Sequence, residues 1–268
     1  MRNKGRAVQV NKHLGKLADE INLYVFHSND CFSFITNKVD TTYHKHYYIQ
    51  LTIGLEKQFK CQFDDATYNI RGILIGSNVN HKLIGHNEWQ LYMLINPEST
   101  LGELIKSKWL LSSEHILLTD DIVNDIVHII PNKMAGDQYK LFFEKMKKIL
   151  GKESYQQSNR DERIMRLIQY IDDHSLDELS VKKLSNVVFL SESRLSHLFK
   201  EQIGISLTSY ILHKKVEKGF HHIFHGKSIT ESALEAGFST PSHFTNSVRD
   251  KLGMSPRHIL KDSSYLQV

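Results

Sequence analysis

The sequence predicts an α+β multidomain protein with an N-terminal β domain, a helical linker region and a C-terminal all-α domain that holds two helix-turn-helix units. Three observations support this prediction. Short runs of β-branched and aromatic residues, separated by turn formers, occupy residues 22–98. Helical periodicity replaces them over residues 99–150. Ser180–Ser206 then aligns without a gap to Ile229–Ser255, 49 residues further on, and such a repeat indicates one supersecondary unit used twice.

The N-terminal part begins with an arm, residues 1–21, that has no strong pattern. The β domain follows as six short runs at regular spacing: Leu23–Phe26, Phe32–Ile35, Tyr47–Ile53, Phe59–Phe63, Ile73–Ile75 and Trp89–Ile95. Many short strands of this kind are typical of a β-sandwich or a β-barrel. The residues alone leave both architectures open.

The helical region at 99–150 carries two apolar stripes, Ile122 with Ile126 and Phe142 with Met146. Such stripes are usually core packing. A small β domain cannot cover both, however, so we expect this linker region to mediate a homodimer through one self-complementary patch. The polar, aperiodic residues 151–161 are predicted to be the interdomain linker.

The second repeat unit carries the signals that start and stop two short helices. Ser228 precedes the first helix, and Glu231 stands three residues on, which is the capping-box spacing. Gly237 is placed to end that helix in the left-handed conformation. Thr240 then caps the next helix, with Pro241 in its first position.

The first repeat unit has Ser180 and Ser191 as the corresponding caps. A longer helix over Leu207–His225 joins the two units and fixes their spacing. The whole domain is predicted at residues 162–262, followed by a tail at 263–268.

The second helix of each unit turns short polar and basic side chains outward, as a helix that enters the DNA major groove does. These predicted DNA-binding residues are Ser193, Arg194, Ser196, His197, Lys200, Ser242, His243, Thr245, Asn246 and Arg249. Lys200 and Arg249 are expected on phosphates, and Asn246 can pair bidentately with adenine. The alternatives are a plain helical bundle with solvated faces, or a structural helix-rich adaptor; the repetition of the whole capped unit disfavours both.

Residues Arg163–Ile259 resemble the DNA-binding domain of the AraC/XylS transcriptional regulators. The resemblance rests on the run Ile229–Ser239, on Ser242-His243-Phe244 and on Gly253–Pro256. It implies a double-stranded DNA operator, RNA polymerase as a partner if the protein is an activator, and a cupin-like β-barrel that senses a small-molecule effector. Gly219, where the family usually has alanine, should weaken its helix by about 1 kcal/mol, and Ser232 stands where the family usually has an aliphatic residue.

Four polar residues of the β domain resemble the metal ligands of cupin enzymes: His44, His46, His81 and, in place of the usual acid, Gln50. In a strand, His44 and His46 would face the same side, and neutral imidazoles can bind divalent Zn, Ni, Fe or Cu. Because Gln50 lacks the charge of a carboxylate, we expect polar lining, no cofactor and no enzyme. The rival hypothesis is a cupin-type metal-binding protein or metalloenzyme with a helical appendage. The candidate effector pocket comprises Phe32, Phe34, Tyr43, His44, His46, Tyr47, His81 and Trp89.

Composition adds bounds but no function. The 268 residues carry a net charge of +4, and residues 158–262 hold 15 Lys and Arg against 13 Asp and Glu. Bulk charge alone would not indicate DNA. The two cysteines, Cys31 and Cys61, form no disulfide framework and suit a reducing cytosol. Since no apolar run reaches the roughly 18 residues of a membrane span, we expect a cytoplasmic protein without a membrane partner.

Overall fold

The computed structural model describes residues 23–27, 30–131, 136–151, 160–260 and 265–267. The predicted N-terminal arm and most of the predicted interdomain linker lie outside these residues. The chain divides into two compact units. The first unit comprises Met1–Tyr155 with Asp250–Val268, and the second unit comprises Gln156–Arg249. Each is described by itself.

The first unit contains two β-sheets. The larger has the order β10-β1-β2-β8-β3-β6-β9, and the smaller has the order β5-β4-β7. Their strands are β1 Leu23–His27, β2 Cys31–Thr36, β3 Ile49–Gly54, β4 Phe59–Gln62, β5 Thr67–Ile70, β6 Gly72–Ile75, β7 Lys82–Ile84, β8 Gln90–Ile95, β9 His115–Leu117 and β10 Tyr265–Gln267. Strand pairs are antiparallel, except that β1 and β10 run parallel. The six predicted strand runs are all present within this set.

The described strands form two separate sheets and no closed barrel, so the cupin-like barrel implied by the resemblance is not confirmed. A barrel closes when the edge strands of its sheet pair with each other. Here the edges of the larger sheet are taken by β9, which pairs with β6, and by β10, which pairs with β1. Only short bridges link the remaining segments, such as His44 with His81.

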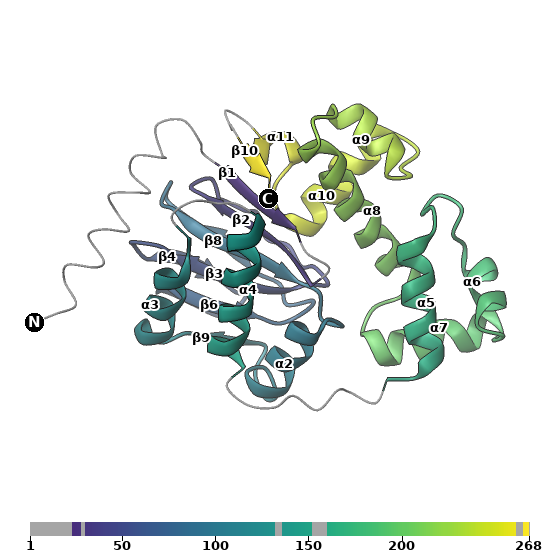
Figure 1. Ribbon diagram of the computed structural model, residues 1–268, viewed down its shortest axis with the longest axis horizontal. Coiled ribbons are helices and arrows are strands. Elements are labelled where there is room, and N and C mark those ends of the chain that lie inside the picture. The colour runs from purple at the N-terminus through teal and green to yellow at the C-terminus, as the bar shows by residue number, and fades with distance from the viewer. Residues whose placement is uncertain (1–22, 28–29, 132–135, 152–159, 261–264, 268) are drawn as a thin grey trace, which may run out of the picture. The chain divides into compact units, whose positions relative to one another are not determined.

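Helices α2 Thr100–Lys108, α3 Asp120–Ile129 and α4 Gly136–Leu150 belong to the first unit, and Figure 1 shows α3 and α4 lying against the larger sheet. Their apolar faces join the sheet in one hydrophobic core, which includes Leu51, Met93, Ile105, Val123, Ile126, Phe142, Met146 and Leu150. Phe142 is 4% exposed and Met146 is fully buried. The stripe expected to pair between two chains is therefore packed inside one chain. The periodicity predicts a helix correctly, but it does not show which surface covers the apolar face of that helix.

The helices outside that core are α5 Glu162–Asp173, α6 Val181–Val187, α7 Glu192–Ile203, α8 Leu207–Phe224, α9 Ile229–Glu235, α10 Pro241–Leu252 and α11 Pro256–Leu260. The second unit holds α5 to α9 and α10 as far as Arg249. The predicted caps are confirmed: Ser180, Ser191 and Ser228 each accept a hydrogen bond from a backbone N–H of their helix, and Ser228 with Glu231 forms the capping box. No helix in the described ranges is long and apolar enough to cross a membrane.

The repeat is not gapless, contrary to the sequence alignment. Ser180 and Ser228, which cap the first helix of each unit, lie 48 residues apart. The hydrogen bonds that close the following turns keep this offset, because Leu190 N–H donates to Ser185 and Phe238 N–H donates to Ala233, both at 3.0 Å. The caps of the second helices, Ser191 and Thr240, are 49 residues apart. The turn of the second unit therefore contains one additional residue.

The additional residue changes which side chains correspond. The alignment pairs Phe189 with Phe238, yet Phe238 is 4% exposed whereas Phe189 is 93% exposed. Phe189 instead takes the left-handed position of its turn, with φ 54°, where the second unit has Gly237 with φ 84°. A bulky residue in that conformation is an outlier, because its Cβ crowds the backbone. The counterpart of Phe238 is Leu190, which is half-buried.

Gly219 has a packing role that its helix propensity does not reveal. A Cβ atom on Gly219 would lie 2.5 Å from the ring of Phe244, which is closer than two carbon atoms can approach. Phe244 is fully buried on the inner face of α10 and packs edge-to-face against Phe220 and Phe238. The glycine in α8 therefore makes room for the aromatic ring.

Candidate nucleic-acid interface

Each of the two predicted recognition helices buries its apolar residues and exposes its polar ones, as the periodicity predicts. On α7, Leu195, Leu198, Phe199 and Ile203 are buried, and on α10, Phe244, Val248 and Leu252 are buried. All five predicted DNA contacts of α7 are exposed, and so are Ser242, His243, Asn246 and Arg249 of α10. Thr245 alone is half-buried. Each helix thus presents one continuous polar face.

Some of these side chains already have partners within their own helix. The Ser196 hydroxyl donates to the Glu192 carbonyl oxygen at 2.8 Å, which turns its proton back along the helix. The Arg249 guanidinium donates to Asn246 Oδ1 at 3.0 Å. Arg249 therefore orients the Asn246 amide so that its NH₂ group remains available. For a carboxamide that is to pair with adenine, this partner must be displaced or shared.

Helix α8 holds both helix-turn-helix units. At its start, Tyr210 packs edge-to-face on Phe199 of α7 with ring centroids 5.3 Å apart. Towards its end, Phe220 meets Phe244 of α10 at 6.1 Å. Lys215 donates to the Gly237 carbonyl oxygen at 2.7 Å and so anchors the second turn. With 18 residues, α8 is about 27 Å long, a rigid spacer between the two recognition helices.

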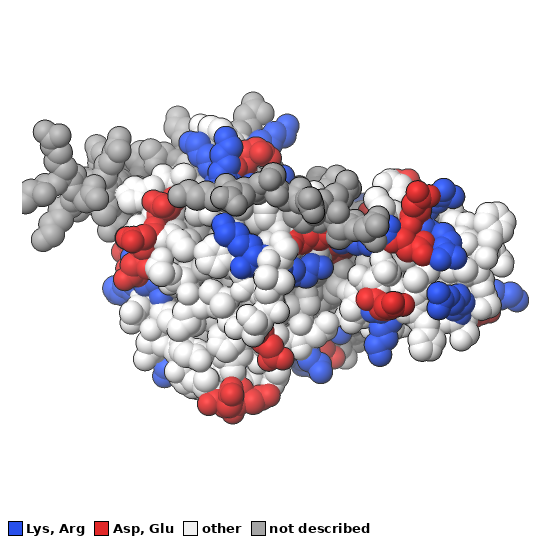
Figure 2. All heavy atoms as spheres, turned by 90° about the horizontal axis from the view of Figure 1, so that it is seen from below, with Lys and Arg blue, Asp and Glu red and all other residues white. Residues whose placement is uncertain are grey.

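Charge does not mark the interface by itself. On the face seen in Figure 2, Lys and Arg side chains are interspersed with Asp and Glu. Several basic side chains are paired locally, such as Arg163 with Asp161 and Lys183 with Glu178. Recognition of DNA would therefore depend on the two helix faces rather than on one broad basic surface.

The predicted effector-pocket residues differ in their exposure. Phe32, Phe34 and Tyr47 are buried, Tyr43 is 49% exposed, and Trp89 packs against the hydrophobic core. Of the predicted set, only Phe34 lines the apolar pocket of the first unit, whose wall consists of Phe34, Thr36, Lys38, Val39, Tyr92, Leu252, Met254 and Ile259. The sequence reasoning missed seven of these residues, because they come from strands, a loop and the C-terminal segment that no local pattern connects.

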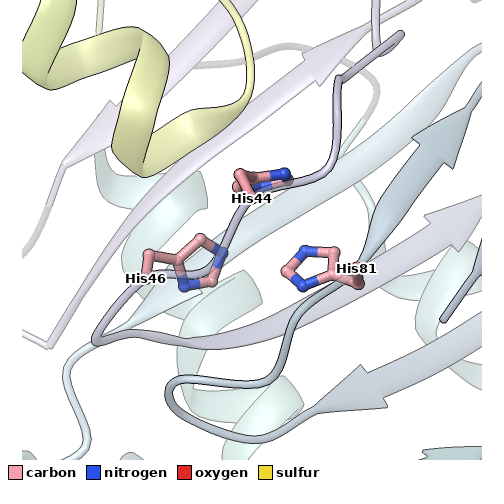
Figure 3. A group of neighbouring side chains, drawn as sticks. All are labelled: His44, His46 and His81. Atoms are coloured by element: carbon pink, nitrogen blue, oxygen red, sulfur yellow. The ribbon is translucent and has the colours of Figure 1, made fainter. Parts of the chain in front are cut away.

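The three histidines of the first unit do lie together. Figure 3 shows the rings of His44, His46 and His81 around a common space, and one ligand atom from each lies within 4.8 Å of the others. They are 5%, 2% and 0% exposed. Burial lowers the pKa of His44 to about 3 and also lowers the pKa values of His46 and His81, so all three imidazoles are neutral at neutral pH.

Gln50 joins the histidine cluster. Its Oε1 lies 2.9 Å from His46 Nε2 and 3.0 Å from His81 Nε2. The Tyr92 hydroxyl donates to the same Oε1 at 2.9 Å, and Gln50 Nε2 donates to Thr52 at 3.1 Å. The three histidines and Gln50 are the residues that the sequence predicted together as candidate metal ligands. Tyr92 was missed, because it comes from β8 and no spacing relates it to the others.

Comparison with known proteins adds relatives at the level of sequence. Residues 184–262 match a family described as a helix-turn-helix domain. The probable transcriptional regulator LumQ of Photobacterium leiognathi is 27% identical over 240 residues, spanning 80% of this chain and 90% of LumQ. The transcriptional activator RhaS of Escherichia coli is 28% identical over 123 residues, 45% of this chain and 44% of RhaS. The chain thus matches less than half the length of RhaS.

Solved structures show the same fold over most of the chain. The apo form of a ToxT variant from Vibrio cholerae matches with a TM-score of 0.58 and 13% identity, covering 91% of this chain and 97% of that chain. Wild-type ToxT bound to an unsaturated fatty acid gives a TM-score of 0.52 at 15% identity, covering 91% and 95%. An N-terminal sheet domain and a C-terminal helical domain are therefore a known combination.

Proposed function

This chain belongs to the AraC/XylS family of DNA-binding transcriptional regulators, and from that premise we propose that it reads two successive major grooves of a double-stranded operator with α7 and α10. The observation that supports the proposal is that the two helices share the same arrangement of cap, buried face and exposed face. Each begins at a side-chain cap, buries an apolar face and exposes a polar one. Helix α8 connects the two units, and reading successive major grooves requires the two helices to lie about one helical turn of DNA apart, roughly 34 Å.

The residues have distinct proposed roles in this contact. Ser193, Ser196 and His197 of α7, with Ser242, His243 and Asn246 of α10, meet base edges. Lys200 and Arg249, which correspond in the repeat, bind phosphates. Base contacts set the sequence, whereas phosphate contacts set affinity and its dependence on salt.

The proposal is tested on DNA sites selected by the protein from a random pool. Footprinting should reveal two protected base clusters about 10 bp apart in a non-palindromic site. Asn246→Ala should relax preference by about 1–3 kcal/mol at one base pair of one cluster only. Arg249→Ala should weaken all sequences alike and flatten the salt slope by about one unit.

Lys148→Ala is the matched control, because it removes one exposed charge from the first unit. It should leave the site and the salt slope unchanged. Protection of a single groove, or loss of preference at the same base pair in His197→Ala and Asn246→Ala, would contradict reading by two helices.

The assembly and setting complete the proposal. We place the protein in the cytoplasm, where its DNA partner is, and RNA polymerase is its partner if it activates. We propose that the protein forms a homodimer through the outer face of α4, where Leu141 is 56% exposed. The family consists of regulators rather than enzymes, so no catalytic role is assigned.

An effector is proposed for the apolar pocket that Phe34, Tyr92, Leu252 and Met254 help to line. ToxT has been solved with an unsaturated fatty acid, and Lys38 offers a cation at the wall of this pocket. We expect a monounsaturated fatty acid to change operator affinity, and Lys38→Ala to diminish that change without altering affinity in its absence. Lys45→Ala, on an exposed neighbouring lysine, is the control. Operator affinity that is unmoved by the fatty acid would contradict this effector class.

A further inference from the structure

The hydrogen bonds of the three buried histidines fix where their protons are. Each Nδ1 lies beside a backbone carbonyl oxygen: His44 with Thr42 at 2.9 Å, His46 with Tyr48 at 3.0 Å and His81 with Val79 at 2.9 Å. A carbonyl oxygen only accepts, so each Nδ1 must carry the proton. In a neutral imidazole, the Nε2 atom then has a lone pair and no hydrogen. All three rings therefore present unprotonated Nε2 atoms.

The lone pairs of two of these Nε2 atoms face another hydrogen-bond acceptor, Gln50 Oε1, instead of a donor. Gln50 Oε1 is 2.9 and 3.0 Å from Nε2 of His46 and His81, and it already accepts from Tyr92. Rotating the Gln50 amide would offer two N–H groups to the histidines, but it would turn the same nitrogen towards the Tyr92 hydroxyl. The Nε2 of His44 is buried without any partner. Neither amide orientation satisfies every group.

A cation satisfies all of them. Three Nε2 atoms and one amide oxygen are four acceptors, whereas a water molecule has only two protons to donate. We propose that the first unit binds one divalent first-row transition metal ion through Nε2 of His44, His46 and His81 and Oε1 of Gln50. This site is independent of the proposed DNA contact.

The spacing of the donor atoms fits such an ion. Metal–nitrogen bonds of roughly 2.0–2.1 Å place adjacent ligands of an octahedral ion about 3.0 Å apart and those of a tetrahedral ion about 3.4 Å apart. The two Nε2–Oε1 separations are 2.9 and 3.0 Å, and the ligand atoms of the three histidines lie within 4.8 Å of one another. The donor atoms are therefore close enough for one ion to be shared after small side-chain movements.

The backbone holds these ligands in place before any ion binds. His44 and His81 exchange two backbone hydrogen bonds at 3.0 Å, and Asn78 N–H donates to the His46 carbonyl oxygen at 2.7 Å. The carbonyl contacts at each Nδ1 orient the rings, which is the outer-shell arrangement typical of histidine ligands. The Tyr92 hydroxyl does the same for Gln50.

The test uses the full chain without a histidine tag, stripped of metal with a chelator and titrated with Co²⁺, then Ni²⁺ and Zn²⁺. We expect one equivalent bound, with visible Co²⁺ absorption bands whose intensity reports the coordination number. His46→Ala and His81→Ala should each weaken binding at least 100-fold. Gln50→Glu, which supplies the missing charge at nearly unchanged volume, should tighten binding at least tenfold.

His86→Ala is the matched control, since His86 is exposed and lies in the same unit; it should bind as the parent protein does. No saturable uptake, or equal uptake by the parent protein and His46→Ala, would overturn the proposal. If His46→Ala does not fold, Gln50→Glu decides: a metal-induced rise in its melting temperature larger than that of the parent supports the site, and an equal or smaller rise refutes it.

Discussion

Gly219→Ala is expected to destabilise the second unit by about 1–3 kcal/mol, although alanine is the better helix former by about 1 kcal/mol. The reason is the 2.5 Å approach between the added Cβ and the Phe244 ring. That ring is fully buried and is held by Phe220 and Phe238, so it cannot move aside without opening the core. Chemical denaturation of the purified protein measures the change.

A second substitution identifies the cause. The first repeat unit has Leu195 where the second has Phe244, so Phe244→Leu removes the clash with a residue that the motif already uses. In the Gly219→Ala background, Phe244→Leu should cost less than it does alone, with a coupling of about 0.5–3 kcal/mol. Lys218→Ala, the neighbouring position on α8, is the control. If Gly219→Ala alone raises the denaturation midpoint, helix propensity governs this position and the packing argument is wrong.

Met146→Lys should unfold the first unit rather than release a monomer. Met146 is fully buried among apolar side chains, so a lysine there would bring an unpaired charge into the core. Removing or adding one unpaired buried charge typically costs on the order of 3–5 kcal/mol, which is a large part of the stability of a domain. Insoluble protein, or loss of the unfolding transition of the first unit, is the expected measurement.

Leu141→Lys separates core from interface on the same helix. Leu141 is 56% exposed, so its replacement should leave the melting temperature nearly unchanged. Sedimentation should show that the variant is monomeric, because we place the homodimer contact on this face of α4. A soluble, folded Met146→Lys monomer would contradict the burial of the stripe, and a dimeric Leu141→Lys would exclude the outer face of α4.

Local signals predicted the helical domain well, because caps and glycines act within a few residues of themselves. The Ser228 capping box and the left-handed Gly237 just after α9 could be placed from sequence for this reason. The offset of the repeat was wrong within the turn. Phe189 and Phe238 are identical residues, so the alignment paired them, whereas one is exposed and the other is buried. When two turns differ in length, identical residues within them need not occupy equivalent structural positions.

The first unit was predicted less completely, because its features depend on contacts between distant segments. The strand runs were visible, but the pairing of β6 with β9, across the whole of α2, was not. The histidine cluster could be proposed because His44 and His46 are close in sequence. The contribution of Tyr92 and the orientation of each ring depend on tertiary hydrogen bonds, and no spacing rule encodes them.

Because the two recognition helices have equal cap-to-cap spacing, the segment that contains one helix can replace the segment that contains the other. Ser191 and Ser206 are 15 residues apart, as are Thr240 and Ser255, and each interval contains a glycine with positive φ two residues before its end. A 15-residue segment can therefore be transplanted from one position to the other with both of its boundaries intact. The transplant is asymmetric, however: α7 brings a leucine to the space beside Gly219, whereas α10 brings a larger aromatic ring to a site shaped for leucine. New operator specificities are thus easier to build by copying α7 than by copying α10.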